Sequence, residues 1–385
     1  MAVWNGGAYV HEAVSSVLRQ TFSDFELLIV DDASTDGAIA ELPRDERIRV
    51  LRNERNLGQV PSLNRGLQEA RGAYVARLDA DDVMLPTRLE RQVAVLDANP
   101  LVALAGTWMD VVDDAGRRWG TTRGRIDSYI DYVAALLLDR IPFGHPSIMY
   151  RSDAVRALGG YEVSLAPSED KDLYRRLALE RHEARVVPEA LVRYRRHEMQ
   201  LSQLQIERQL ANDHASQERF LTELAPHLPA RTLRLVLAAE PAFWAEPPLG
   251  ELESFLDGTT ARLRLTRQEH EALGRFIAAR CMRALRTGWS AQCAVDKSRA
   301  AAPAAFASAH GGPGASAGLA LLPLLLGLRP VGVRLGSSRL RARRALRHSA
   351  RMAHLRALAQ RSRTLRRLYT ALLGFRLLDD DIDAP

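Results

Sequence analysis

The chain has 385 residues, of which 46% are hydrophobic and 26% are charged, a composition that suits a folded protein with a sizeable core. Only two cysteines occur, Cys281 and Cys293, which excludes a disulfide framework and a cysteine-based metal site. The formal net charge is +6, but the first half is acidic on balance, and no acidic side chain occurs between Asp296 and Asp379.

The first half of the chain alternates helix and strand patterns. Apolar residues at helical spacing predict a helix over roughly residues 8–20. Buried strands are predicted at Glu26–Val30, Ile48–Leu51, Tyr74–Leu78 and Leu101–Ala105, with helices beginning near Pro61 and Pro86. This alternation predicts parallel strands joined by helical crossovers. Ligands of such α/β folds bind beyond the carboxyl ends of the strands.

Two acidic clusters follow predicted strands directly. In the run Asp79-Ala80-Asp81-Asp82, alternate carboxylates on an extended segment would point the same way and suit Mg²⁺ or Mn²⁺ together with substrate phosphates. The alternative is a solvated turn that complements the dipole of the following helix. In the cluster that begins at Asp31, Asp32 could accept hydrogen bonds from a nucleobase or ribose. The alternative there is an Asx turn.

Two further sites depend on the fold. Ser168 precedes a predicted helix and could cap it, or one of the carboxylates of Glu169 and Asp170 could act as a general base. His197 follows a predicted strand near Leu191–Tyr194. This histidine becomes a candidate metal ligand only if the fold brings it to Asp81.

After about residue 200 the pattern changes to long helices. We expect a helical extension at 204–299, a linker at 300–316 and a basic helical tail at 317–385. The tail suits an anionic membrane surface or a solvated helix face, and the near absence of aromatic residues beside its arginines argues against nucleic acid. The apolar run at 315–328 is short for a membrane span, which needs about 20 residues. No signal peptide is visible, so we expect a cytoplasmic protein or one bound peripherally to the inner face of the plasma membrane.

Several motifs occur in a fixed order over residues 1 to about 203, and together they resemble family 2 glycosyltransferases. They are Met1-Ala2-Val3-Trp4-Asn5-Gly6, the stretch from Gln20 to Asp36, the stretch from Arg71 to Asp82, His145-Pro146-Ser147, Gly159-Gly160-Tyr161, Glu169-Asp170 with Asp172-Leu173, and Tyr194-Arg195-Arg196-His197. The resemblance implies a GT-A fold, with a Rossmann-like and mostly parallel sheet flanked by helices and followed by a mainly α-helical C-terminal region. It also implies a glycosyltransferase domain at 1–203 whose first strand is truncated, since only Met1–Trp4 of that strand is present.

The resemblance also implies roles for individual residues. Asp32 would contact the nucleobase with Asn5 nearby, and Asn56 in the next loop would belong to the same nucleotide-sugar site. Asp79 would face the ribose and Asp81 would coordinate Mn²⁺ or Mg²⁺, with Asp79 and His197 as further metal ligands. Asp170, with Glu169 beside it, would be the base that deprotonates the acceptor.

The resulting expectation is an inverting transfer from a UDP- or dTDP-sugar to a hydroxyl of a glycan or lipid-linked acceptor, in bacterial surface polysaccharide synthesis. One alternative is a sugar nucleotidylyltransferase, although Asn5-Gly6-Gly7-Ala8 lacks the basic residue that such a phosphate loop usually carries. The other is a catalytically impaired protein of the same fold that acts as a binding or scaffold protein at the membrane. The presence of both Asp81 and Asp170 argues against this second alternative.

Overall fold

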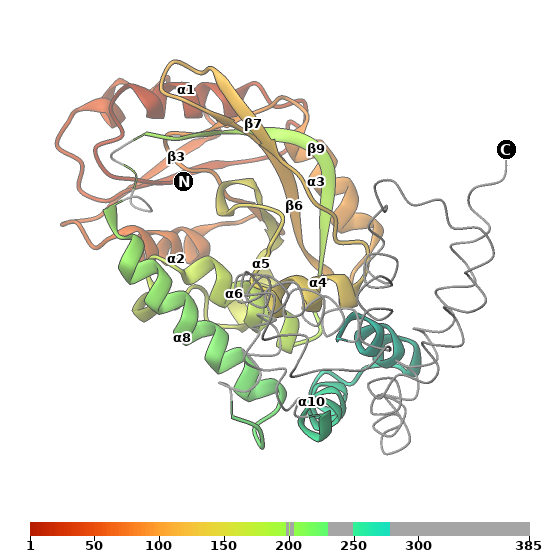
Figure 1. The fold of residues 1–385 in the computed structure, drawn as a ribbon. Coiled ribbons are helices and arrows are strands. Elements are labelled where there is room, and N and C mark those ends of the chain that lie inside the picture. Colours follow the sequence, from red (N-terminus) through yellow and green to blue (C-terminus); the bar gives the residue numbers. More distant parts are fainter. Residues whose placement is uncertain (198–199, 201–203, 230–248, 278–385) are drawn as a thin grey trace, which may run out of the picture. The chain divides into compact units, whose positions relative to one another are not determined.

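The computed structural model describes residues 1–197, 200, 204–229 and 249–277, without the side chains of 249–253 (Figure 1). One compact unit comprises Met1–Ala230 together with Gly258–Glu269. The predicted linker at 300–316, the basic tail at 317–385 and the apolar run at 315–328 lie outside the described residues. Within the part of the chain that is described, no helix is both long and apolar enough to cross a membrane.

The first sheet is parallel and has three strands in the order β1-β2-β3. These strands are β1 (Ala2–Val3), β2 (Leu27–Asp31) and β3 (Ile48–Arg52). Helix α1 (Gly7–Leu18) connects β1 to β2, and helix α2 (Gln59–Glu69) follows β3 and packs against β1 and β2. Ile29 of β2 pairs with Val50 and is fully buried. This part of the fold agrees with the predicted strand–helix alternation, and it leaves Asp32 just beyond the carboxyl end of β2.

The second sheet is mixed and follows the order β4-β8-β6-β9-β5, with β7 on β6. Its strands are β4 (Tyr74–Ala76), β5 (Val83–Met84), β6 (Val102–Val112), β7 (Arg118–Thr122), β8 (Met149–Arg151) and β9 (Glu183–Arg195). The long strands β6 and β9 run parallel side by side (Figure 1), and the other pairs are antiparallel. Alternation of local patterns predicts orientation only for strands joined by one crossover. It therefore could not predict pairs as distant in sequence as β4 with β8.

The remaining helices are α3 (Arg88–Ala98), α4 (Tyr129–Leu137), α5 (Ser152–Ala157), α6 (Glu169–Leu179), α8 (Ile206–Leu224) and α10 (Leu249–Arg262), with short 3₁₀ turns η1 (Ala38–Glu41), η2 (His145–Ser147) and η3 (Val163–Leu165). Of these helices, α3, α4 and α5 pack against strands of the second sheet. The helices α6 and α8 pack against each other (Figure 1). The leucines Leu173 and Leu177 on α6 are fully buried, as the apolar face of this helix predicted.

A cavity of about 780 Å³ separates β2 from β4. Its lining includes Leu28 of β2, Leu63 of α2 and Ala76 of β4, and none of the residues 79–82. The two sheets share no strand, and strands of both contribute residues to the lining of this cavity. The acidic run begins directly after Leu78, which is part of this lining.

Candidate active site

The acidic run forms a turn between β4 and β5. The backbone N–H of Asp82 donates to the carbonyl oxygen of Asp79 at 3.3 Å, so the expectation of an extended segment is wrong at this point. Because the chain turns back on itself, Asp82 joins the other two carboxylates, and oxygens of Asp79, Asp81 and Asp82 lie within 4.8 Å of one another. Asp82 is thus a candidate metal ligand in addition to the predicted Asp79 and Asp81.

Each carboxylate of this turn has a different environment. Asp79 pairs with the guanidinium of Arg77, and its Oδ1 accepts a hydrogen bond from Gln59 Nε2 at 3.3 Å. Asp82 is fully buried, with Oδ1 accepting from the backbone N–H of Arg195 at 2.8 Å and Oδ2 left without a hydrogen-bond partner. An unsatisfied buried carboxylate oxygen is costly.

Burial and the neighbouring negative charges change the pKa values of these carboxyl groups. Burial, with the charge of Asp79 as a second cause, raises the pKa of Asp81 and, to a greater extent, that of Asp82. A hard divalent cation prefers such carboxylate oxygens and would offset their mutual repulsion. The donor set of this turn therefore fits Mg²⁺ or Mn²⁺.

His197 reaches the turn from the end of β9. Its Nε2 lies 2.9 Å from Asp81 Oδ2, although 116 positions of sequence separate the two residues. The fold therefore brings His197 to Asp81, as a role in metal binding would require. The ring of Tyr9 stacks on the imidazole with centroids 5.5 Å apart, and the guanidinium of Arg195 lies 4.8 Å from the centre of the same tyrosine ring. Helix α1 and strand β9 thus hold the histidine in place. Its role as a metal ligand stays a prediction.

The predicted nucleotide-binding residues lie around the loop after β3. Asp32 is only 3% exposed, and its carboxylate accepts hydrogen bonds from the backbone N–H groups of Leu57 and Gly58, both at 2.8 Å, and from Asn53 Nδ2 at 2.7 Å. Asp32 therefore anchors this loop, and its contact with a nucleobase stays a prediction. Asn56 is exposed in the same loop and its Oδ1 accepts from Gly58 N–H at 3.1 Å.

Asn5 lies on the neighbouring loop after β1. It is exposed, and its Oδ1 accepts a hydrogen bond from the backbone N–H of Thr35 at 2.8 Å. The Asx turn considered for this cluster does form, with Asp31 Oδ1 accepting from Ser34 N–H at 2.8 Å. Asp31 also pairs with Arg52 at 2.8 Å. Asn5 and Asp32 thus border one loop surface at the carboxyl end of the parallel sheet.

Glu169 and Asp170 begin helix α6. The predicted cap by Ser168 is not formed, since its buried hydroxyl has no hydrogen-bond partner. Burial, together with the charge of Asp170, raises the pKa of Glu169 to about 7. Burial also raises the pKa of the half-buried Asp170. Two adjacent carboxyl groups of raised basicity suit proton transfer near neutral pH.

A neutral histidine stands beside this pair. His145 Nδ1 lies 3.8 Å from Glu169 Oε1, and its Nε2 lies 3.0 Å from the hydroxyl of Tyr161. Burial, with Arg77 as a second cause, lowers the pKa of His145 well below its ordinary value, so the contact with Glu169 is not an ion pair at neutral pH. The motifs His145-Pro146-Ser147 and Gly159-Gly160-Tyr161 therefore meet at the start of α6.

Arg77 connects the two acidic groups and was missed in the sequence. Its guanidinium is buried and pairs with Asp79, and its charge also acts on Glu169 and on Asp170. Its Nε has no hydrogen-bond partner. The only signal for it was its position two residues before Asp79, and nothing in the sequence distinguished it from the many other arginines of the chain.

Comparison with known proteins identifies the class of this site. The family model described as Glycosyl transferase family 2 matches residues 1–159. The putative glycosyltransferase EpsE of Bacillus subtilis is 33% identical over 202 residues, which cover 51% of this chain and 71% of EpsE. The O-antigen biosynthesis glycosyltransferase WbnJ of Escherichia coli is 30% identical over 205 residues, which cover 51% of this chain and 78% of WbnJ.

The chain belongs to glycosyltransferase family 2 and is a glycosyltransferase. Its α/β fold class and its enzyme class, both inferred from the ordered motifs, are thereby confirmed. Among solved structures, TarS of S. aureus in complex with UDP aligns at 18% identity and a TM-score of 0.45, covering 74% of this chain and 88% of that chain.

Proposed function

We propose that this enzyme transfers a sugar from a nucleotide-sugar donor, a UDP- or dTDP-sugar, to a hydroxyl group of a glycan or lipid-linked acceptor. The transfer inverts the anomeric configuration and depends on Mn²⁺ or Mg²⁺. The observation that carries the proposal is the acidic turn, in which three carboxylates converge within 4.8 Å and one buried oxygen of Asp82 lacks any hydrogen-bond partner.

The acidic turn would form the donor side of the site. Asp79, Asp81 and Asp82 would hold the cation, with His197 as a further ligand or as a support for Asp81. A bound cation supplies positive charge that stabilises the departing nucleoside diphosphate. Asp32, Asn5 and Asn56 would shape the surface that receives the nucleoside, because they position the loops at the carboxyl end of the parallel sheet.

The beginning of α6 would form the acceptor side. Asp170 would accept the proton of the acceptor hydroxyl while that oxygen attacks the anomeric carbon and the bond to the diphosphate breaks. A single displacement from the opposite face inverts the configuration. Glu169 is more deeply buried than Asp170, and its Oε2 has no hydrogen-bond partner, so it would orient the acceptor or share the proton. Asp170 is the better base because it is the more accessible of the two.

The names of similar proteins support a role in bacterial polysaccharide synthesis. WbnJ is described as an O-antigen biosynthesis glycosyltransferase, and AmsE of Erwinia amylovora, 27% identical over 194 residues, as an amylovoran biosynthesis glycosyltransferase. We extend this role to the present chain as part of the proposal. Action at the cytoplasmic face of the plasma membrane is a further part of it, supported by the arginine-rich sequence of 317–385.

A donor screen tests the proposal. Release of nucleoside diphosphate from UDP- and dTDP-sugars is measured with Mn²⁺, with Mg²⁺ and with a chelator, and the product's anomeric configuration is read by NMR. We expect turnover with at least one donor that the chelator abolishes. Full turnover in the chelator, or with Asp170→Asn, would contradict the metal or the base assignment respectively. Formation of a sugar nucleotide from a sugar phosphate would instead indicate a nucleotidylyltransferase.

A further inference from the structure

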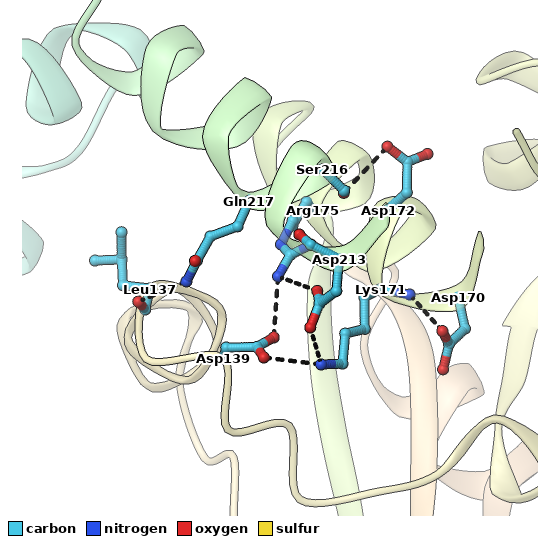
Figure 2. A network of polar contacts seen from close by, with 9 residues as sticks. All are labelled: Leu137, Asp139, Asp170, Lys171, Asp172, Arg175, Asp213, Ser216 and Gln217. Atoms are coloured by element: carbon cyan, nitrogen blue, oxygen red, sulfur yellow. Dashed lines mark hydrogen bonds and ion pairs between the residues drawn. The ribbon is translucent and has the colours of Figure 1, made fainter. Parts of the chain in front are cut away.

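Lys171 follows the proposed base directly in sequence, yet its ammonium group points away from it. The backbone N–H of Lys171 donates to Asp170 Oδ1 at 2.8 Å. The side chain extends to the other side, where Nζ contacts Asp139 Oδ2 at 2.8 Å and also pairs with Asp213 (Figure 2). The ammonium of the residue next to Asp170 is therefore engaged with two other carboxylates.

The same two carboxylates also bind an arginine one helical turn further along α6. Arg175 Nη2 lies 3.0 Å from Asp139 Oδ1 and 2.9 Å from Asp213 Oδ1 (Figure 2). Two cations and two carboxylates thus form a neutral cluster, in which the Arg175 side chain is 2% exposed and that of Asp213 is 7% exposed. Charges removed from water in this way need matched partners.

The members of this cluster come from three segments of the chain. Asp139 lies just after α4 in a left-handed conformation with φ 52°, Lys171 and Arg175 lie on α6, and Asp213 lies on α8. Asp213 therefore links α8, which follows residue 203, to the helix that carries the proposed base. The neighbouring contact between Ser216 of α8 and Asp172 of α6, at 3.4 Å, strengthens the same junction.

A free lysine at this position would interfere with the base. An ammonium on a flexible four-carbon stem can reach a neighbouring carboxylate, and such a pair stabilises the ionised form and makes it a weaker proton acceptor. The other groups that act on Asp170 are Glu169 beside it, Arg77 after β4, Tyr174 on α6 and Asp213. Of the two cations nearby, Arg77 is already paired with Asp79.

We propose that Asp213 and Asp139 are positioning residues that hold the ammonium of Lys171 away from Asp170, so that the base stays unpaired. This inference rests on the proposed function, in which Asp170 deprotonates the acceptor. Asp213 and Asp139 act through Lys171 and touch neither donor nor acceptor in this scheme. No local pattern indicates this cluster, because Lys171 lies 32 positions from Asp139 and 42 positions from Asp213.

The test is a set of variants measured for acceptor-dependent turnover across pH. In Asp213→Asn, Lys171 keeps only Asp139, which Arg175 also binds, so its ammonium is free to turn toward Asp170. We expect kcat to fall by about tenfold, which is less than the roughly hundredfold or greater loss expected for removing the base. The acidic limb of the pH profile moves to lower pH, because the pairing lowers the pKa of the base. The KM for the donor stays unchanged.

The decisive measurement is rescue by a second substitution. Lys171→Met in the Asp213→Asn background should return kcat and the pH profile to the level of Lys171→Met alone. A cluster that only stabilises the junction of α6 and α8 would instead lower the stability of Asp213→Asn without moving its pH profile, and this outcome would overturn the inference. Asp139→Asn provides a second route if Asp213→Asn folds poorly, since asparagine tolerates the left-handed conformation of that residue.

A matched control separates the charge effect from loosening of the helices. Asp172→Asn removes a buried carboxylate that pairs with Arg176 at 2.6 Å on the same helix, without touching Lys171. Lys171→Met should not rescue this variant. If Asp170→Asn is fully active, the base assignment of the proposed function fails, and the inference fails with it. If Asp170→Asn is inactive but no rescue occurs, only the role of Asp213 and Asp139 is wrong.

Discussion

His197 Nε2 and Asp81 Oδ2 lie 2.9 Å apart, although 116 positions of sequence separate these residues. The contact closes the acidic turn against the end of β9 and limits the orientations open to the Asp81 carboxylate. A ligand whose orientation is fixed before the cation arrives binds it more tightly. The first two predictions concern these two residues.

Asp81→Asn should abolish metal-dependent turnover. The amide removes one negative charge from the three-carboxylate turn, and with it much of the attraction for a divalent cation. We expect the affinity for Mn²⁺, measured by calorimetry or electron paramagnetic resonance, to fall by at least about tenfold, and turnover to fall further. Asp24→Asn is the control, because Asp24 is exposed and outside the site. Equal Mn²⁺ affinity in both variants would show that the cation binds elsewhere.

His197→Gln should weaken Mn²⁺ binding by about 10- to 100-fold, the usual cost of losing a partner that orients a metal ligand. The same titration of Mn²⁺ measures it. His214→Gln, at an exposed position on α8, should leave the affinity unchanged. If the affinity survives in His197→Gln while the nucleotide-sugar KM rises, the histidine contacts the donor rather than the cation.

Glu169→Gln should change how stability depends on pH. Burial raises the pKa of Glu169 from 4.5 to about 7 in the folded protein, so its contribution is present below pH 4.5 and is lost as the pH rises through about 7. Glutamine does not ionise, so the variant does not lose stability in this pH range through residue 169. We expect the free energy of unfolding of the variant, relative to the parent, to rise between about pH 4 and about pH 8 by up to roughly 3 kcal/mol.

Urea denaturation at several pH values measures this effect. The same substitution at Glu46, which is exposed, provides the control and should give a difference that does not vary with pH. A constant difference for Glu169→Gln as well would show that Glu169 is not held protonated by its surroundings.

Gly159→Ala and Gly160→Ala should differ although both glycines have φ 81°. A side chain at either position strains the left-handed backbone by about 1–2 kcal/mol. At Gly160 the added Cβ would also lie 2.5 Å from Asn64 Oδ1, whereas Gly159 has open space. Because this Cβ overpacks the site, we expect Gly160→Ala to be less stable than Gly159→Ala by about 1 kcal/mol. Thermal denaturation of the two variants measures the difference.

The clash at Gly160 should also reach the site. Asn64 Oδ1 accepts from the backbone N–H of Tyr161, and the Tyr161 hydroxyl contacts His145 beside Glu169. We therefore expect Gly160→Ala to lower turnover more than Gly159→Ala at a temperature where both are folded. Equal turnover in the two variants would show that Tyr161 and His145 do not influence the reaction.

Local patterns predicted the elements and the two acidic clusters well. The periodicity of residues 8–20 and the apolar run ending at Val30 each depend on neighbours within one element, and both agree with α1 and β2. The acidic clusters were placed at strand ends for the same reason. The turn at Asp79–Asp82 was considered only as a solvated alternative to the metal site, because its shape depends on β5 pairing with β9.

The parts of the site that could not be predicted depend on contacts between segments distant in sequence. His197 could be assigned only conditionally, since nothing local says that β9 ends beside Asp81. Arg77 and Asp213 gave no signal, because a buried arginine and a helical aspartate look like surface residues in a sequence rich in both charges. The resemblance to a family supplied roles for Asp32 and Asp170 that periodicity could not supply.

The family model matches residues 1–159, so it ends before Glu169 and Asp170 and well before Asp213 of α8. The segment that the family model matches contains the acidic turn, whereas part of the surroundings of the proposed base, including Asp213, comes from later residues. Helix α8 fills part of the core there, with Phe220 and Leu221 buried. Under the proposed function, substitutions on α8 would therefore change the surroundings of the base without altering any residue of the acidic turn.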